Sequence, residues 1–570
     1  MVLQQYERQT LPRGFHPAGW DAIEPYLREL LDRNVVTVQE LERWLLDWSE
    51  LASVVQEEGT RRRTAKDRDT DNPAVDAEFL AWVEGVQPKL QPFLFALQKK
   101  LASHPAASAL KKDEFGRYLR SVRNAVDIFR QENVALGVEE VKLQARYKTL
   151  VGAQTVQFDG AERTLSQMRL YFESPDRNVR ENAWRLSEER RAKDYDTFNG
   201  IFEKLYSLRL KKAANANCKD YRELRWRENE RFDYTPEDCL TFSASIEKVC
   251  VPRMKKLQAE RRAKLGVGHL RPWDMDVDPH GDKQLKPFND VRELAAKARE
   301  SFSHVDPLFA EYFDTMARNE LLDLDNRKGK SPGGYQTTFH ERRLPFIFMN
   351  AAGTTGDVKT LLHEGGHAFH SIEHRGQRII GNRGAPMEFC EVASMSMEFM
   401  GGEHIHKTFY NDADARRAQI RHLEQVVAFM PWMTTVDCFQ HWLYTNPNHT
   451  RADRDAKWIE LRRRFEGDVD WSGLESAARH RWMQQLHLFS YPFYYIEYGI
   501  AQLGALQVWR NYLDDPKQAV KDYRHALSLG STRSLPELFK AANIKFDLSA
   551  TMLESLMQMV DEKLEELKAA

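Results

Sequence analysis

The sequence lacks the features that mark a membrane protein or a nucleic-acid-binding protein. No apolar run approaches the ~18–20 residues that a membrane-spanning helix needs. The formal net charge is only −2 over 570 residues, so no overall field attracts nucleic acid or an anionic membrane surface. We therefore expect neither nucleic acid nor membrane as a partner.

Cysteine is scarce, and its distribution argues against disulfides. The five cysteines are odd in number and scattered, and no C-x-x-C spacing occurs. We expect reduced thiols and a cytoplasmic location. Internal repeats and low-complexity tracts are absent as well. A content of 42% hydrophobic and 29% charged residues is typical of a globular chain.

Most of the sequence has a helical apolar pattern. This pattern covers residues 1–150, continues in charged segments to about residue 265, and returns over 400–570. Thr149 to Phe158 is the first strand-like segment, and Asp159-Gly160 after it is a hairpin turn signal. We expect a mainly α protein with an N-terminal helical region over 1–155 and a second domain over 156–570, which contains the motifs described next.

One motif carries clear chemistry: His363-Glu364-Gly365-Gly366-His367. On a helix, two histidines four residues apart present their imidazoles on one face, where both can bind one metal ion. Glu364 lies beside the first ligand and can take a proton from a metal-activated water. The pattern H-E-x-x-H therefore predicts a zinc hydrolase. A buried polar helix without metal is the competing interpretation.

The flanking sequence predicts a helix over 358–375. Asp357 is the expected N-cap, and Gly376 the expected C-terminal stop. Gly365 and Gly366 inside the helix each cost about 1 kcal/mol relative to alanine. We interpret this cost as a sign of close approach by another element or a ligand.

A catalytic zinc needs a third protein ligand and one open position. The metzincin pattern fails, because a glycine and a histidine are missing at the required spacing. The segment from Met387 to Glu398 is helical by composition, and it offers Glu388, Glu391 and Glu398 on one face. Spacing alone does not separate Glu388 from Glu391.

Two further segments are candidates for substrate contacts. Leu344 to Asn350 is strand-like, and we weigh two readings evenly: an edge strand with which a peptide could pair, or a core hairpin. Tyr491, Tyr495 and Tyr498 are spaced as one helical face near His487. Their hydroxyls could stabilise a developing oxyanion, or they could form an aromatic core stripe.

Taken together, these motifs resemble the thimet oligopeptidase and oligoendopeptidase F family of zinc metallopeptidases, especially its shorter bacterial members such as Pz-peptidase. The resemblance covers residues 150–570. It rests on the following residues: Gly333-Gly334-Tyr335, Pro345 to Asn350, Asp357 with the histidine motif, Glu391-x-x-Ser394 with Glu398, and His487 with the tyrosines.

The resemblance implies a ligand set and a mechanism. It implies His363, His367 and Glu391 as ligands of one Zn2+ per chain, and Glu364 as general base. Glu398 would orient a ligand histidine. It also implies substrate or oxyanion contacts from the following residues: His487, Tyr491 and Tyr498. The implied fold is mostly helical, with two halves flanking a deep substrate channel and a small sheet beside the zinc helix.

We therefore expect a zinc-dependent oligoendopeptidase that acts on short unstructured peptides. Expected further substrate contacts are Gly333, Gly334, Phe346, Phe348 and Tyr495. One departure from the thimet branch is that Ser490 and Pro492 stand where that branch has a glycine-rich loop.

Two alternatives remain at this stage. One is a zinc carboxypeptidase, which needs a fixed charge for a chain terminus, with Arg342 and Arg343 as candidates. The other is a peptide-binding scaffold without catalysis. The oligomeric state stays open.

Overall fold

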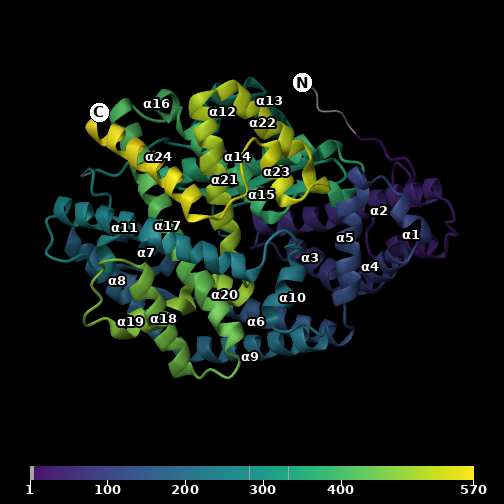
Figure 1. Cartoon of the computed structure of the whole chain (residues 1–570), viewed down its shortest axis with the longest axis horizontal. Coiled ribbons are helices and arrows are strands. Elements are labelled where there is room, and N and C mark those ends of the chain that lie inside the picture. The colour runs from purple at the N-terminus through teal and green to yellow at the C-terminus, as the bar shows by residue number, and fades with distance from the viewer. Residues whose placement is uncertain (1–5, 282, 332) are drawn as a thin grey trace. The chain divides into compact units, whose positions relative to one another are not determined.

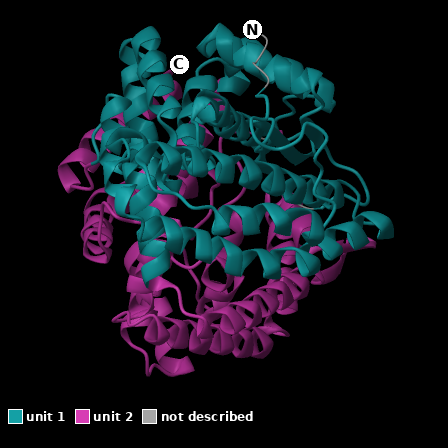
Figure 2. Cartoon of the chain, turned by 90° about the vertical axis from the view of Figure 1, so that its right-hand side faces the viewer, with its two compact units in different colours: residues 1–127, 285–415, 501–546 teal, residues 128–284, 416–500, 547–570 magenta. Residues whose placement is uncertain are grey.

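The computed structural model describes residues 6–281, 283–331 and 333–570, and it is mainly helical with two small sheets (Figure 1). This confirms the predicted fold class. The chain forms two compact units, each assembled from three separate segments (Figure 2). Unit 1 comprises residues 1–127, 285–415 and 501–546, and unit 2 comprises residues 128–284, 416–500 and 547–570. The boundary at residue 155 expected from the sequence stays a prediction.

Unit 1 holds the N-terminal helices and the helix with the histidine motif. Its helices of eight residues or more are α1 (Trp20–Asp32), α2 (Val38–Arg68), α3 (Pro73–Gly85), α4 (Gln87–Ala102), α5 (Lys112–Ile128, whose last residue falls in unit 2), α12 (Val291–Val305), α13 (Pro307–Arg318), α14 (Thr355–Glu373), α15 (Met387–Gly402) and α22 (Pro516–Ser528). Two short helices complete it: α16 (Ile405–Thr408) and α23 (Leu535–Ala541).

Unit 2 is also built from helices and one hairpin. Its helices are α6 (Glu132–Gly152), α7 (Leu165–Phe172), α8 (Arg177–Ala192), α9 (Tyr195–Asn215), α10 (Tyr221–Glu228), α11 (Pro236–Lys264), α18 (Arg451–Phe465), α19 (Glu475–His480), α20 (Leu486–Ser490) and α24 (Ala550–Ala569). Besides α5, two helices have residues in both units: α17 (Asp412–Thr445) and α21 (Tyr495–Asp514). Among the described helices, none combines the length and apolarity required to cross a membrane.

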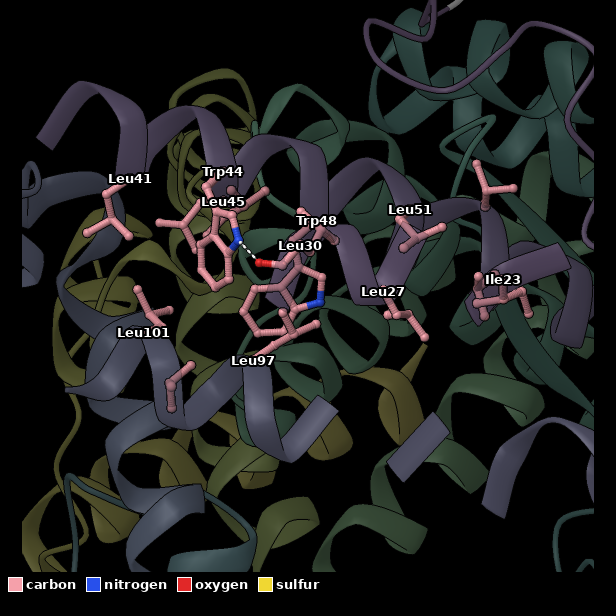
Figure 3. Close-up of a cluster of buried hydrophobic side chains, with 14 of the residues drawn as sticks. Ile23, Leu27, Leu30, Leu41, Trp44, Leu45, Trp48, Leu51, Leu97 and Leu101 are labelled. Carbon is pink, nitrogen blue, oxygen red and sulfur yellow. Dashed lines mark hydrogen bonds between the residues drawn. The ribbon is translucent and has the colours of Figure 1, made fainter. Parts of the chain in front are cut away.

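The N-terminal helices of unit 1 pack around a buried apolar cluster drawn from α1, α2 and α4 (Figure 3). Trp44 lies at its centre and is fully buried, and its indole N–H donates to the carbonyl of Leu30 at 2.8 Å. Burial of a tryptophan is favourable when its polar N–H also finds an acceptor. The apolar residues around Trp44 on α2 therefore face a core.

A three-stranded sheet lies beside α14 and has the order β3-β5-β4. Its strands are β3 (Leu322–Asp325), β4 (Tyr335–Phe339) and β5 (Leu344–Ala351). Strand β5 pairs parallel with β3 and antiparallel with β4. Of the two readings of Leu344 to Asn350, the edge strand is therefore wrong, because the segment is central and paired on both sides. The core hairpin is the one observed, and it is formed with β4. Pro345 is tolerated near the start of the strand, where a missing N–H costs least.

The second sheet is the hairpin predicted at Asp159-Gly160. Strands β1 (Thr155–Phe158) and β2 (Ala161–Thr164) pair antiparallel across this turn. Asp159 has φ 50° and Gly160 has φ 71°, and two positive φ values are typical of the tight turns that join twisted strands. The turn prediction is confirmed.

The helix with the histidine motif begins one turn earlier than expected. Thr354, not Asp357, is the N-cap of α14, and the two residues form a reciprocal capping box. The Thr354 hydroxyl accepts from the Asp357 N–H, and the Asp357 carboxylate accepts from the Thr354 N–H at 2.7 Å. Such boxes satisfy two N–H groups at a helix start. The helix ends at Glu373 and is followed by a 3-10 turn over His374–Gly376.

Candidate functional site

Three side chains from two helices converge in unit 1. His363 and His367 lie one turn apart on α14, and Glu391 comes from α15. The Nε2 atoms of the two histidines lie 3.5 and 3.7 Å from the same carboxylate oxygen of Glu391. Within the part of the chain that the structure describes, these three form the group of ligating residues that could hold one ion. Glu388, the competing candidate, is not part of this group.

The spacing of these atoms fits a tetrahedral metal. Adjacent ligands at 2.0–2.1 Å from a tetrahedral ion lie roughly 3.4 Å from each other, close to the two distances observed. The donor set of two imidazoles and one carboxylate is that of a catalytic zinc with one open position. Although burial lowers the pKa of His363, a hydrogen bond and the charges of Glu398, Glu391 and Glu364 raise it to about 9. The site therefore stabilises positive charge.

Close helix packing brings the third ligand to the first two. A Cβ atom added at Gly366 would lie 2.6 Å from the Cα of Ser394 and 2.7 Å from the carbonyl oxygen of Ala393. Both atoms belong to the backbone of α15, so only glycine permits this approach. A Cβ at Gly365 would meet the ring of Phe302 at 2.5 Å. The predicted close approach at both glycines is confirmed.

An acidic partner orients the first histidine. Nδ1–H of His363 donates to Oε1 of Glu398 at 2.6 Å, and Lys359 lies 3.2 Å from Oε2 of the same carboxylate. Such a bond fixes the tautomer and leaves Nε2 available for a metal. The hydroxyl of Ser394 donates to the Glu391 carboxylate at 3.3 Å. Both contacts agree with the expectation that Glu391, Ser394 and Glu398 share a face.

Glu364 is a buried carboxyl beside this group, and its pKa is raised to about 7. Burial is the largest cause, and the negative charge of Glu391 adds to it. The charge of His363 and a hydrogen bond from the backbone N–H of Gln336 in β4 act in the opposite direction. A carboxyl with a pKa near neutrality can both accept and return a proton at physiological pH. The hydrogen bond also shows that β4 lies next to the catalytic candidate.

The second group of candidates belongs to unit 2. The His487 ring is surrounded by tyrosine rings, with centroid distances of 4.6 Å to Tyr495, 6.0 Å to Tyr491 and 6.2 Å to Tyr498. Tyr494, which the sequence reasoning missed, completes the cluster at 5.8 Å. Burial lowers the pKa of His487 to about 4. The imidazole is therefore neutral at pH 7 and can donate a hydrogen bond from one ring nitrogen.

The spacing of the tyrosines predicted that they share one helical face, and this prediction is wrong. Helix α20 ends at Ser490 and α21 begins at Tyr495, so Tyr491 lies in the turn between them. Tyr495 and Tyr498 are on the first turn of α21. Tyr491 is 43% exposed, whereas Tyr495 is 9% exposed and accepts a hydrogen bond from Gln485. Tyr491 is therefore the one of these two that a ligand can reach.

The residues expected to contact substrate differ in their exposure. Phe346 and Phe348 are fully buried in β5, and their expected contact with substrate stays a prediction. Gly333 and Gly334 are exposed and lead directly into β4, and Gly333 has φ 100°. Strand β4 pairs with one neighbour among the described strands, so it provides the edge that was expected at β5.

Two signals in the sequence could have revealed residues that were missed. Lys359 precedes His363 by four residues and so shares its helix face. Gln336 directly follows Tyr335 of the family motif. In an edge strand, a backbone N–H such as that of Gln336 can bond to a neighbouring helix, here to Glu364 of α14.

Comparison with known proteins gives two family matches. The model described as peptidase family M3 matches residues 170–558, and the model of the peptidase M3 N-terminal domain matches residues 15–129. Oligopeptidase PepF of Bacillus subtilis is 22% identical over 490 residues, which are 80% of this chain and 70% of PepF. The chromosomal oligoendopeptidase F of Lactococcus lactis subsp. cremoris is 22% identical, over 56% of this chain and 52% of its own length.

Solved structures match over nearly the whole chain. Pz peptidase A, solved with an inhibitor, has a TM-score of 0.87 at 28% identity and covers 95% of this chain and 96% of its own. An oligoendopeptidase F from Bacillus anthracis has a TM-score of 0.86 at 25% identity and covers 98% of this chain and 99% of its own. These matches agree in fold and in family with the resemblance drawn from the motifs.

Proposed function

The chain belongs to peptidase family M3 and is a metalloendopeptidase, and we propose that it is a zinc-dependent oligopeptidase that cleaves internal bonds of short unstructured peptides. The observation that carries the zinc proposal is the convergence of His363, His367 and Glu391 at tetrahedral spacing, with the buried carboxyl of Glu364 beside them. In this proposal the two histidines and Glu391 are the metal ligands.

The metal and Glu364 have separate roles. Zinc, when bound, would polarise the scissile carbonyl and acidify a water molecule. Glu364 takes a proton from the attacking water and delivers it to the leaving amine. Burial raises its pKa, which favours uptake of that proton, and a carboxyl whose pKa lies closer to the working pH serves better as both base and acid. Glu398 keeps His363 in the tautomer that leaves Nε2 unprotonated.

We place the substrate along β4 rather than β5. An extended peptide can add to the unpaired edge of a sheet through main-chain hydrogen bonds. Strand β4 is next to Glu364 through Gln336, and the exposed Gly333 and Gly334 at its start leave room for a backbone to approach. A main-chain mode of binding accounts for a preference for unstructured peptides, since folded segments have no free strand to offer.

The proposal also gives a role to three hydrogen-bond donors predicted from the sequence. Tyr491, Tyr498 and neutral His487 would donate to the oxygen that gains negative charge as water attacks. Donors aimed at that oxygen lower the barrier because they bind the transition state more strongly than the ground state. Tyr495 is buried and engaged by Gln485, so its part is to support the cluster.

The exopeptidase alternative lacks a free cation at the proposed place. Arg342 donates to the buried carboxylate of Glu57 at 2.8 Å. Arg343 donates to the carbonyl of Arg375 at 2.8 Å and stacks on the Tyr6 ring. Neither is available to capture a chain terminus. The free thiols of all five cysteines fit the proposed cytoplasmic location.

The ligand set is tested by two matched variants on one helix. Glu391→Ala should lose bound zinc, measured by elemental analysis, and with it the cleavage of a quenched peptide that is blocked at both ends. Glu388→Ala removes the same functional group one turn earlier and should keep both. An empty site in Glu388→Ala with a loaded site in Glu391→Ala would overturn the assignment. Failure of the wild type to cut the blocked peptide would overturn endopeptidase action.

A further inference from the structure

The turn that joins α20 to α21 in unit 2 is short and conformationally demanding. It comprises residues 491–494 and carries Tyr491, with His487 one turn upstream. Phe493 has φ 61°, in the left-handed region that side chains other than glycine rarely adopt. Its ring is fully buried. Such a conformation persists only where neighbouring groups hold it.

Arg209 of α9 binds the end of α20. Its Nη1 donates to the carbonyl of Leu488 at 2.9 Å, and its Nη2 donates to the carbonyl of Phe489. Carbonyl groups in the last turn of a helix have no partner within the helix. These two are buried, and one planar guanidinium satisfies both. Arg209 is itself fully buried, and its Nε donates to Glu140 at 2.8 Å.

Two further arginines bind the turn itself. Arg225 of α10 donates from Nε to the carbonyl of Pro492 at 3.3 Å. Arg231, which follows α10, donates from Nη2 to the carbonyl of Phe493 and to Oε1 of Glu497 at 2.6 Å. Glu497 lies in the first turn of α21, so Arg231 ties the turn to the helix that carries Tyr498.

The amide side of the turn is held as well. The N–H of Phe493 donates to Oε1 of Gln440 on α17 at 2.6 Å. Four carbonyls and one amide within six residues are thus bound by four side chains, from α9, from α10, from the segment after α10 and from α17. A guanidinium remains charged at every pH the protein meets and offers five donors in a rigid fork. The arrangement therefore fixes both position and orientation of the turn.

We propose that Arg209, Arg225 and Arg231 are positioning residues that set the direction of His487 and Tyr491 by holding the backbone that carries them. They act through the turn and need no contact with substrate. This inference rests on the proposed function, because it matters for catalysis only if Tyr491 and His487 meet the reacting peptide. It adds three residues, far away in sequence, to those that determine the rate.

Arg225 provides the test, because its side chain is 24% exposed and its second hydrogen bond is to Glu228 on the same helix, at 3.1 Å. In Arg225→Met the loss of one carbonyl contact should lower kcat about 10-fold while KM changes less than twofold, since an error of about 1 Å in a catalytic group costs up to 10²-fold. Arg225→Lys, which keeps one donor, should recover part of the loss. Arg222→Met is the matched control on α10: Arg222 bonds to Asp220 and does not contact the turn.

A structural role alone would not produce coupling to one tyrosine. In a Tyr491→Phe background, Arg225→Met should therefore cost much less than in the wild type. Hydrogen exchange of the amides in residues 488–494 should quicken in Arg225→Met and not in Arg222→Met, independently of any turnover. Zinc content and melting temperature are recorded for every variant, so that loss of metal or of fold is recognised.

The outcomes distinguish failure of the positioning proposal from failure of the proposed function. If Tyr491→Phe is impaired but Arg225→Met has wild-type kcat or an additive loss, the positioning proposal is wrong and the proposed function stands. If Tyr491→Phe has full activity, the proposed role of Tyr491 is wrong, and the positioning proposal falls with it. Unchanged hydrogen exchange in Arg225→Met would also overturn the positioning proposal.

Discussion

Replacing Gly366 by alanine should weaken metal binding without touching any ligand. The added methyl would lie 2.6 Å from the Cα of Ser394, whereas ordinary contacts of this kind begin at 3.4 Å. The nearest atoms are backbone, so no side-chain rotation relieves the clash. Helices α14 and α15 must therefore separate locally by about 0.8 Å. Ser394 is one turn from Glu391, and the third ligand moves with it.

The size of the effect follows from metal geometry. Ligand distances in a working site hold to within about 0.2 Å, so a shift of about 0.8 Å pulls Glu391 out of bonding range unless its side chain follows. We expect zinc affinity to fall at least about 10-fold and overpacking to cost about 1–3 kcal/mol of stability. Zinc affinity is measured by competition with a chelator, and stability by calorimetry on the metal-free protein.

The control variant changes a glycine of α15, the helix that the Gly366→Ala methyl would clash with. A Cβ at Gly402, the last residue of α15, meets nothing within 4 Å, so Gly402→Ala should bind zinc as the wild type does. Equal affinity of Gly366→Ala and Gly402→Ala would refute the reasoning, because it would mean that helix separation does not set the position of the third ligand.

Three further variants test single side chains. Glu364→Ala should retain zinc and lose at least ~10³-fold in kcat, measured with a quenched peptide; undiminished turnover would remove the proposed mechanism. Glu398→Gln should weaken zinc about 10-fold in the chelator assay, because His363 loses its charged acceptor; unchanged affinity would contradict this. Burial lowers the pKa of His340 to about 4, below its ordinary value near 6.5, so the unfolded chain binds more protons between these values. The contribution of His340 to stability is then complete above pH 6.5 and falls by on the order of 3 kcal/mol toward pH 4; calorimetry should show a shallower fall in His340→Gln, and parallel curves would disprove it.

The sequence predicted the chemistry of the candidate site better than its surroundings. The two histidines and Glu364 lie within five residues on one helix, and helical geometry alone brings them together. The choice between Glu388 and Glu391 depends on how α15 crosses α14. That crossing depends on Gly366, and a glycine in a sequence does not reveal what it packs against.

The sheet and the tyrosine segment show two different limits. Strand β5 became central because β3, about twenty residues earlier, pairs with it in parallel, and such non-local pairing leaves no mark in the strand itself. The break before α21 did leave a mark. Pro492 disfavours helix in the residue before it, so the spacing of the tyrosines should have been read with this proline in view.

The interleaved segments of the two units have a consequence for biosynthesis. Unit 1 needs residues 501–546 and unit 2 needs residues 547–570, so neither is complete until those late segments have been synthesised. Until then, apolar surface of the earlier segments stays exposed to solvent, which favours slow maturation and chaperone dependence. No contiguous fragment of this gene should yield either unit as a well-behaved, independently expressed protein.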